Sequence, residues 1–299
     1  MTSTVEQITF EAADGWTLTG DLYRGQAPRV AILISAGTGF PRRFYRHIAA
    51  WLAEQGAIVL TYDYRGIGDS GSDNLGASGI EYPDWGRYDM AAALNVLADA
   101  APGLPLTHIG HSVGGQFVGF MPNHDQIARN AFVCVGSGYW GLHKPRYWPL
   151  ELYFWWIMGS FSLKRWGYFK PLGLKWEPLP PKVFRAWRRW SSRRSYLLPE
   201  LEEGRWPHQF DKVTTPVCSW VFSDDNVATD RASRDVLSWL PSAPASIVYR
   251  RPSDYGLRSI GHSAAFLRGR EAIWQEIWAW LAEDRMPQDR VEITPRKMA

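Results

Sequence analysis

Cysteine is scarce in this sequence, with two copies, Cys134 and Cys218, in 299 residues. Both lie in apolar runs and far apart in the chain, so we interpret them as buried, reduced thiols of a cytosolic protein. This pattern argues against a disulfide framework and against a cysteine-based metal site. The sequence also has little net charge. Its value of +3 is too small to indicate nucleic acid as a partner of the whole chain.

The sequence also has no long apolar run. Its most hydrophobic window, Leu150–Leu163, contains one glutamate, one glycine and two serines, and it is too short to span a bilayer. The first 15 residues have neither a basic start nor an apolar stretch, so we expect no signal peptide. These observations, together with the absence of low-complexity tracts, predict a globular protein of the cytoplasm.

Apolar runs and helical periods alternate along most of the chain, which is typical of an α/β protein with a parallel sheet. A hairpin is expected first, because residues 5–23 alternate apolar with polar on either side of Asp14-Gly15. The predicted strands that follow are 29–35, 57–62, 106–109, 130–135, 217–222 and 246–249.

A glycine-flanked serine follows one of these strands. Residues 106–109 form a short apolar run, and Gly110-His111-Ser112-Val113-Gly114 comes next, before a segment compatible with a helix. G-x-S-x-G between a strand and a helix is the pattern of a nucleophile elbow, in which the serine occupies a tight turn. Ser112 is therefore our candidate nucleophile.

Two other patterns look chemical but favour a structural interpretation. Gly66, Gly68 and Gly71 match the dinucleotide fingerprint G-x-G-x-x-G, yet they open a polar loop where the fingerprint requires a helix. His108 and His111 form H-x-x-H, but they occupy the strand and the elbow and have no third ligand nearby. We therefore expect no metal site and no cofactor.

An acid and a histidine complete the pattern that Ser112 begins. Asp224 and Asp225 follow the predicted strand 217–222, and His262 follows the last predicted strand. A serine hydroxyl needs a base to take its proton, and the imidazolium that forms needs a carboxylate to orient it. His262 could instead cap the helical segment that begins near Ala264.

The order serine, acid, histidine, together with the elbow, resembles the α/β-hydrolase fold from Val5 to Leu281. The segment Asp63–Ser70 is similar to the family's turn after its fourth strand, and Ala36–Gly39 takes the place of its His-Gly oxyanion turn, with Ala36 in place of the frequent histidine. The resemblance implies a mostly parallel, eight-stranded α/β-hydrolase sheet that is flanked by helices and carries an inserted cap.

The resemblance also implies roles for particular residues. It favours Asp225 over Asp224 as the triad acid, because the family's acid is commonly followed two places on by an apolar residue, here Val227. The oxyanion hole would consist of the backbone N–H groups of Val113 and Thr38.

Residues 139–212 interrupt the α/β pattern, and we expect them to form a helical cap between core parts 1–138 and 213–299, the latter ending in a polar tail. The insert holds nine of the 17 tryptophans, and 14 Lys and Arg against six Asp and Glu. Most of these tryptophans are expected to pack the cap onto the sheet. Three further roles fit this composition: an apolar pocket, a basic amphipathic segment at 182–196 that contacts an anionic membrane, or an oligomer interface. The candidate pocket residues are Tyr153, Trp155 and Trp156.

Together these features predict a serine hydrolase that cleaves a small carboxylic ester or thioester with a hydrophobic part through an acyl-enzyme. Two alternatives stay open on sequence alone. One is an acyltransferase that uses the same triad, and the other is a ligand-binding protein that keeps the fold with negligible turnover.

Overall fold

A nine-stranded sheet runs through the centre of the computed structural model, which describes residues 3–173 and 176–293. The strand order is β1-β2-β4-β3-β5-β6-β7-β8-β9, and every pair from β4 to β8 along this order is parallel. The strands are β1 Thr4–Glu11, β2 Thr17–Arg24, β3 Val30–Ser35, β4 Ala57–Tyr62, β5 Leu106–His111, β6 Ile127–Val133, β7 Val217–Phe222, β8 Ala245–Arg250 and β9 Val291–Ile293.

The predicted hairpin and all six predicted inner strands are present, within a few residues of their expected ends. The inner strands β3, β4, β5 and β7 are buried along their whole length, which explains why they read as continuous apolar runs. The hairpin pairs antiparallel at one edge, in the register Phe10↔Leu18.

The sheet has nine strands where eight were expected, because a short strand comes from the polar tail. β9 pairs antiparallel with β8, in the register Ile247↔Val291. Its residues are exposed or half-exposed, so no apolar pattern marks them as a strand. The pairing covers the β8 edge, which would otherwise present unpaired backbone groups to the solvent.

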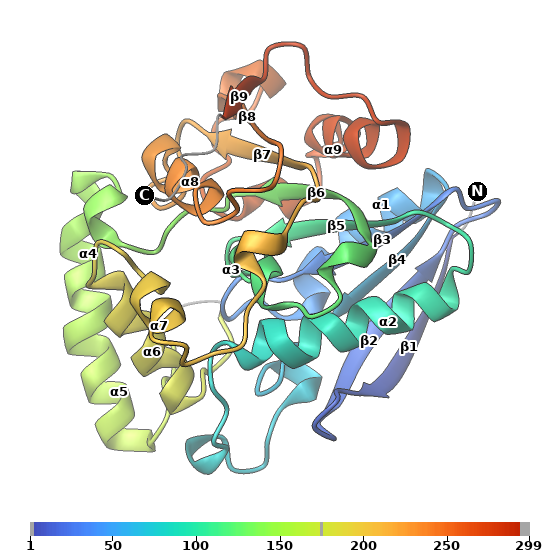
Figure 1. Cartoon of the computed structure of the whole chain (residues 1–299). Helices are drawn as coiled ribbons and strands as arrows, with labels where there is room; N and C mark the ends of the chain where they lie inside the picture. The colour runs from blue at the N-terminus through green and yellow to red at the C-terminus, as the bar shows by residue number, and fades with distance from the viewer. Residues whose placement is uncertain (1–2, 174–175, 294–299) are drawn as a thin grey trace.

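Helices lie on both faces of the sheet (Figure 1). α1 and α9 contact each other, and α2 packs against β3 and β4. The helices outside residues 139–212 are α1 Arg46–Glu54, α2 Ala91–Ala100, α3 Val113–Gln116, α8 Asp230–Leu237 and α9 Glu271–Glu283.

The segment between β6 and β7 is helical, as expected, and its helices gather beside one end of the core (Figure 1). They are α4 Trp148–Leu152, α5 Gly159–Trp166, α6 Pro181–Ser191 and α7 Leu198–Glu202, and a π-helical segment, Tyr153–Met158, joins α4 to α5. We call residues 139–212 the cap; the boundaries of this division remain our prediction.

The apolar face of α6 packs inward, against the rest of the cap. Val183, Phe184 and Trp190 are fully buried, and Trp187 is half-buried. The cap's own core therefore covers the apolar face that an amphipathic helix at 182–196 would present to a membrane, and contact of this segment with a membrane stays a prediction. Among the described residues, no helix is long and apolar enough to cross a membrane.

The glycine turn after β4 is held by buried ion pairs, in agreement with its structural interpretation. Arg65 binds Asp89 through its side chain at 2.7 Å and its backbone N–H at 2.9 Å, and it also binds Asp14 at 2.6 Å. Asp63 accepts from the backbone and the side chain of Arg42. This loop therefore has a structural explanation that involves no nucleotide.

Candidate active site

Ser112 occupies a sharp turn between β5 and α3. Its backbone has φ 51° and ψ −116°, a strained conformation for a residue other than glycine. The flanking glycines allow this turn: a Cβ on Gly110 would lie 2.6 Å from Gly115 Cα, and one on Gly114 would lie 2.2 Å from the Ser35 carbonyl oxygen. The strand, turn and helix thus have the geometry expected of a nucleophile elbow.

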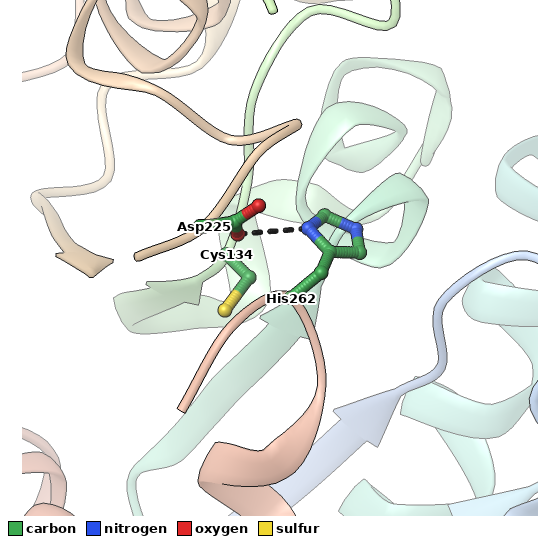
Figure 2. Close-up of side chains that lie close together, drawn as sticks. All are labelled: Cys134, Asp225 and His262. Atoms are coloured by element: carbon green, nitrogen blue, oxygen red, sulfur yellow. Dashed lines mark hydrogen bonds and ion pairs between the residues drawn. The ribbon is translucent and has the colours of Figure 1, made fainter. Parts of the chain in front are cut away.

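His262 links this serine to a carboxylate. Its Nε2 lies 3.2 Å from Ser112 Oγ, and its Nδ1 lies 2.8 Å from Asp225 Oδ2. Figure 2 shows the imidazole and the carboxylate pointing toward each other from the loops that follow β8 and β7. Ser112 and His262 are 150 positions apart in the chain. They come together because the parallel strands β5, β7 and β8 end at the same edge of the sheet.

The two adjacent aspartates have different partners. Asp225 is buried, and its Oδ1 accepts hydrogen bonds from the backbone N–H groups of Val227 at 2.8 Å and Ala228 at 3.1 Å. Asp224 accepts instead from the backbone N–H of Ile260, at 2.8 Å. The geometry therefore selects Asp225 as the partner of His262, while Asp224 positions the loop that carries this histidine.

The electrostatics of the pair suit a base and its orienting acid. Burial alone would raise the pKa of Asp225, but the charge and hydrogen bond of His262 and the two backbone N–H groups outweigh it, so this pKa lies below its ordinary value. Burial alone would lower the pKa of His262, but the carboxylate of Asp225 outweighs it and raises this pKa above the ordinary value. The His262 side chain is 26% exposed, so a ligand can reach it.

His111 joins the elbow to two other loops, a role that sequence reasoning missed. Its Nε2 lies 2.8 Å from the backbone carbonyl oxygen of His262, so this nitrogen must carry the proton and donate. Its Nδ1 then accepts from the Tyr45 hydroxyl, at 2.7 Å, and the Tyr45 oxygen accepts from the backbone N–H of Gly37, at 2.8 Å. Burial, followed by the charge of His262, lowers the pKa of His111 to about 3, so its ring is neutral at physiological pH.

The predicted oxyanion donors lie at the start of α3 and in the loop after β3. Among the described residues, no acceptor is bonded to the backbone N–H of Val113 or of Thr38. The Thr38 side chain forms a hydrogen bond with the Tyr82 hydroxyl, which anchors the loop that carries Thr38. Both N–H groups are therefore free to bind a ligand oxygen.

Comparison with known proteins agrees with this geometry. The family described as serine aminopeptidase, S33, matches residues 26–170. This match covers just under half of the chain and agrees with an α/β-hydrolase fold. No curated protein sequence matches this chain.

Solved structures share the fold over almost the whole chain. A soluble variant of monoglyceride lipase from Saccharomyces cerevisiae, in complex with a substrate analog, has a TM-score of 0.66 at 14% identity and covers 96% of this chain and 97% of its own. A thermostable carboxyl esterase from Bacillus coagulans has a TM-score of 0.62 at 14% identity and covers 93% and 97%. An esterase of Pyrococcus furiosus has a TM-score of 0.61 at 12% identity and covers 94% and 90%. The predicted α/β-hydrolase fold is therefore confirmed.

Cys134 lies beside the triad, which its position in an apolar run did not reveal (Figure 2). Its thiol, the Asp225 carboxylate and a His262 nitrogen lie within 4.8 Å of one another, a spacing that would fit a metal ion. The donor set fits poorly, because burial raises the pKa of the thiol well above its ordinary value and a protonated thiol is a weak ligand. The Asp225 carboxylate already accepts hydrogen bonds from His262 and from backbone N–H groups. Cys134 therefore packs beside the proposed triad as a neutral thiol, and its Sγ donates to the Gly261 carbonyl oxygen at 3.6 Å.

The three aromatic residues proposed to line a pocket lie in different surroundings. Trp155 is buried in the cap, where its ring centroid lies 5.5 Å from Phe184 and 4.8 Å from Trp187. Tyr153 and Trp156 are 50% and 53% exposed and lie on the surface of the cap. The structure therefore brings Ser112, His262 and Asp225 together but does not bring Tyr153 and Trp156 into the same buried environment as Trp155.

Other aromatic side chains adjoin the loop that carries Thr38. Phe40 lies 6.1 Å from Trp176 of the cap, between ring centroids. Tyr82 stacks on Trp190 at 5.4 Å. These side chains were not singled out from the sequence, since contacts between the loop after β3 and the cap join positions more than 100 residues apart.

Proposed function

We propose that this α/β-hydrolase is a serine hydrolase that cleaves a carboxylic ester or thioester with a hydrophobic part. The observation that carries the proposal is the continuous contact from Ser112 Oγ through His262 to Asp225, with the serine on a strained turn. An imidazole with a raised pKa, held by a carboxylate, is suited to accept the serine proton.

The reaction would proceed in two steps. Ser112 Oγ attacks the carbonyl carbon while its proton moves to His262, and the carbonyl oxygen becomes negative between the N–H groups of Val113 and Thr38. Collapse of this intermediate expels the alcohol or thiol, which takes the proton from His262. Water, deprotonated by the same imidazole, then attacks the acyl-enzyme and releases the carboxylic acid, so serine and imidazole return to their initial states.

The hydrophobic part of the substrate is inferred from the aromatic surroundings of the Thr38 loop. Phe40 is buried and Trp176 is half-buried. Their ring centroids lie 6.1 Å apart, where the cap meets this loop. Ligand sites favour large apolar walls with few polar groups. The structural relatives described as esterases and as a monoglyceride lipase support an ester as the substrate class.

Ser112→Ala tests the mechanism. We expect the variant to fold and to lose hydrolysis of p-nitrophenyl esters by about three orders of magnitude or more, because no other nucleophile is in place. A fluorophosphonate probe should label the wild type at Ser112 and leave Ser112→Ala unlabelled. A wild-type protein that is not labelled would instead be a ligand-binding protein with this fold. Product partition with and without an added alcohol acceptor separates hydrolysis from acyl transfer.

A further inference from the structure

One surface of α6 carries arginines at the spacing of a single helix face. Arg185, Arg188 and Arg189 lie at i, i+3 and i+4, and Arg193 lies in the bend just beyond the end of this helix. The opposite face of α6 is buried in the cap. The arginines therefore point away from the cap's core and toward the solvent.

These arginines surround an open cavity of about 300 Å³. Its volume is at the lower end of the range for small-molecule sites, and it fits one small group of a larger ligand. The lining residues are Trp156, Arg185, Arg188, Arg189, Ser192 and Arg193.

Most of the positive charge in this cavity has no carboxylate to balance it. Arg189 binds Glu200 at 2.7 Å. Arg188 donates only to neutral oxygens, the Trp155 carbonyl at 3.3 Å and the Ser160 hydroxyl at 3.1 Å. Within residues 3–173 and 176–293, no acidic side chain forms an ion pair with Arg185, Arg188 or Arg193.

Crowding of like charges is visible at Arg188. Burial, and after it the charge of Arg185, lower the pKa of the Arg188 guanidinium, although arginine stays protonated in proteins. A bound anion would relieve this repulsion. The site thus gains more from an anionic ligand than an isolated surface arginine does.

Trp156 forms an apolar wall of the same cavity. Its indole ring is 53% exposed, and the Arg188 guanidinium carbon lies 5.0 Å from the ring centroid. The ring is held by this cation–π contact while one side stays open. A ligand with an organic part attached to its anion can therefore contact both groups at once.

We propose that this cavity is a binding site for the phosphate group of a phosphorylated organic ligand. Arg185, Arg188 and Arg193 donate to the phosphate oxygens, and Trp156 contacts the organic part. A phosphate suits three guanidinium groups better than a carboxylate does, because it offers three terminal oxygens and up to two charges. None of the lining residues contacts Ser112, His262 or Asp225 through a hydrogen bond or ion pair in the described part of the chain, so this site is distinct from the proposed catalytic one.

Calorimetric titration with sodium phosphate and with pyrophosphate at low ionic strength tests the proposal. Wild type and Ser112→Ala should bind both anions alike, which separates this site from the triad. Arg185→Gln/Arg193→Gln should weaken binding by about tenfold or more, since each charge-assisted hydrogen bond contributes that much. The matched control is Arg231→Gln/Arg268→Gln, which removes the same charge from exposed positions outside the cavity.

A second arm distinguishes a soluble ligand from a lipid headgroup. Vesicles of phosphatidylcholine with and without phosphatidic acid are sedimented with each variant. Sedimentation that needs phosphatidic acid and that Arg185→Gln/Arg193→Gln abolishes identifies a lipid phosphate, whereas anion binding in solution without sedimentation identifies a soluble ligand. The proposal is overturned if the wild type binds neither anion nor vesicle, or if the control pair weakens binding as much as the cavity pair does.

Discussion

Tyr45→Phe removes a single buried oxygen atom that takes part in two hydrogen bonds. The Tyr45 hydroxyl donates to His111 Nδ1 at 2.7 Å and accepts from the Gly37 N–H at 2.8 Å. The ring would stay in place, because it packs edge-on against Phe44 and Phe266 with centroids 5.2 and 5.0 Å away. The substitution therefore isolates the contribution of the hydroxyl.

The expected loss of stability follows from the two groups left without a partner. Each buried donor or acceptor that loses its hydrogen bond costs about 1–3 kcal/mol, so the free energy of unfolding should fall by about 2–6 kcal/mol. A domain near the middle of the ordinary range of stability, about 5–15 kcal/mol, would still fold. Urea denaturation measures this difference directly.

Activity should fall as well, because the hydroxyl connects groups on both sides of the reaction centre. Gly37 precedes Thr38, the proposed oxyanion donor, and His111 Nε2 donates to the backbone carbonyl oxygen of His262 at 2.8 Å. A positioning loss of about 1–2 kcal/mol would lower kcat by about tenfold, with a smaller effect on KM. Hydrolysis of a p-nitrophenyl ester by the folded variant gives both constants.

Tyr168→Phe is the matched control, since the Tyr168 hydroxyl has no side-chain hydrogen bond in the described residues and the substitution is chemically identical. It should leave both stability and kcat near the wild-type values. If Tyr45→Phe unfolds within about 0.5 kcal/mol of the wild type and keeps its kcat, the connection through Tyr45 does not position the site.

Two further substitutions have defined outcomes. Asp225→Asn should lower kcat by about 10⁴-fold. In the wild type, activity rises with pH as His262 loses its proton, at a pKa above the ordinary value of about 6.5. Without the carboxylate the pKa of His262 falls, so this rise in activity should occur at lower pH in the variant. Asp224→Asn is the control, and an equal loss of activity with it would count against Asp225 as the triad acid. Arg65→Met removes the ion-pair partner of the buried Asp89 carboxylate and should lower the free energy of unfolding by about 3–5 kcal/mol. Thermal and urea denaturation measure this change. A change under about 1 kcal/mol would show that the ion pair does not stabilise the fold.

The core of the fold was predictable because its strands are buried on both faces. Such strands have continuous apolar sequences. The predicted ends of β3, β4, β5 and β7 therefore lie within two residues of the observed ends. β9 was not predictable. Its three residues are exposed or half-exposed, and only the free edge of β8 selects them as a strand.

The cap shows the opposite limit. Its helical character follows from composition and periodicity, but the surroundings of its aromatic residues do not, because neighbouring positions on a helix face different environments. Trp155 and Trp156 are adjacent in the sequence, yet the first is buried against Phe184 and the second lies under Arg188 at the surface. A pocket assignment from sequence groups such residues together, while the π-helical segment points adjacent side chains in different directions.

The choice between the two aspartates also depended on geometry. Both follow β7 directly, and only the turn that Val227 and Ala228 impose on the Asp225 carboxylate aims it at His262. The residue two places on supplies one of these donors through its backbone N–H, but this group does not depend on the apolar side chain of Val227. The carboxylate of Asp224 turns toward Ile260 instead.

His111 explains how the parts of this site stay in register. It sits next to Ser112 in the chain, but its two ring nitrogens bind partners 66 positions before it and 151 positions after it. A neutral imidazole is suited to this place, because it donates at one nitrogen and accepts at the other, whereas a protonated ring would donate at both and lose the bond from Tyr45. Burial keeps the ring neutral. His111 therefore joins the proposed nucleophile, the loop of the proposed base and the loop of the proposed oxyanion donor in one hydrogen-bonded unit.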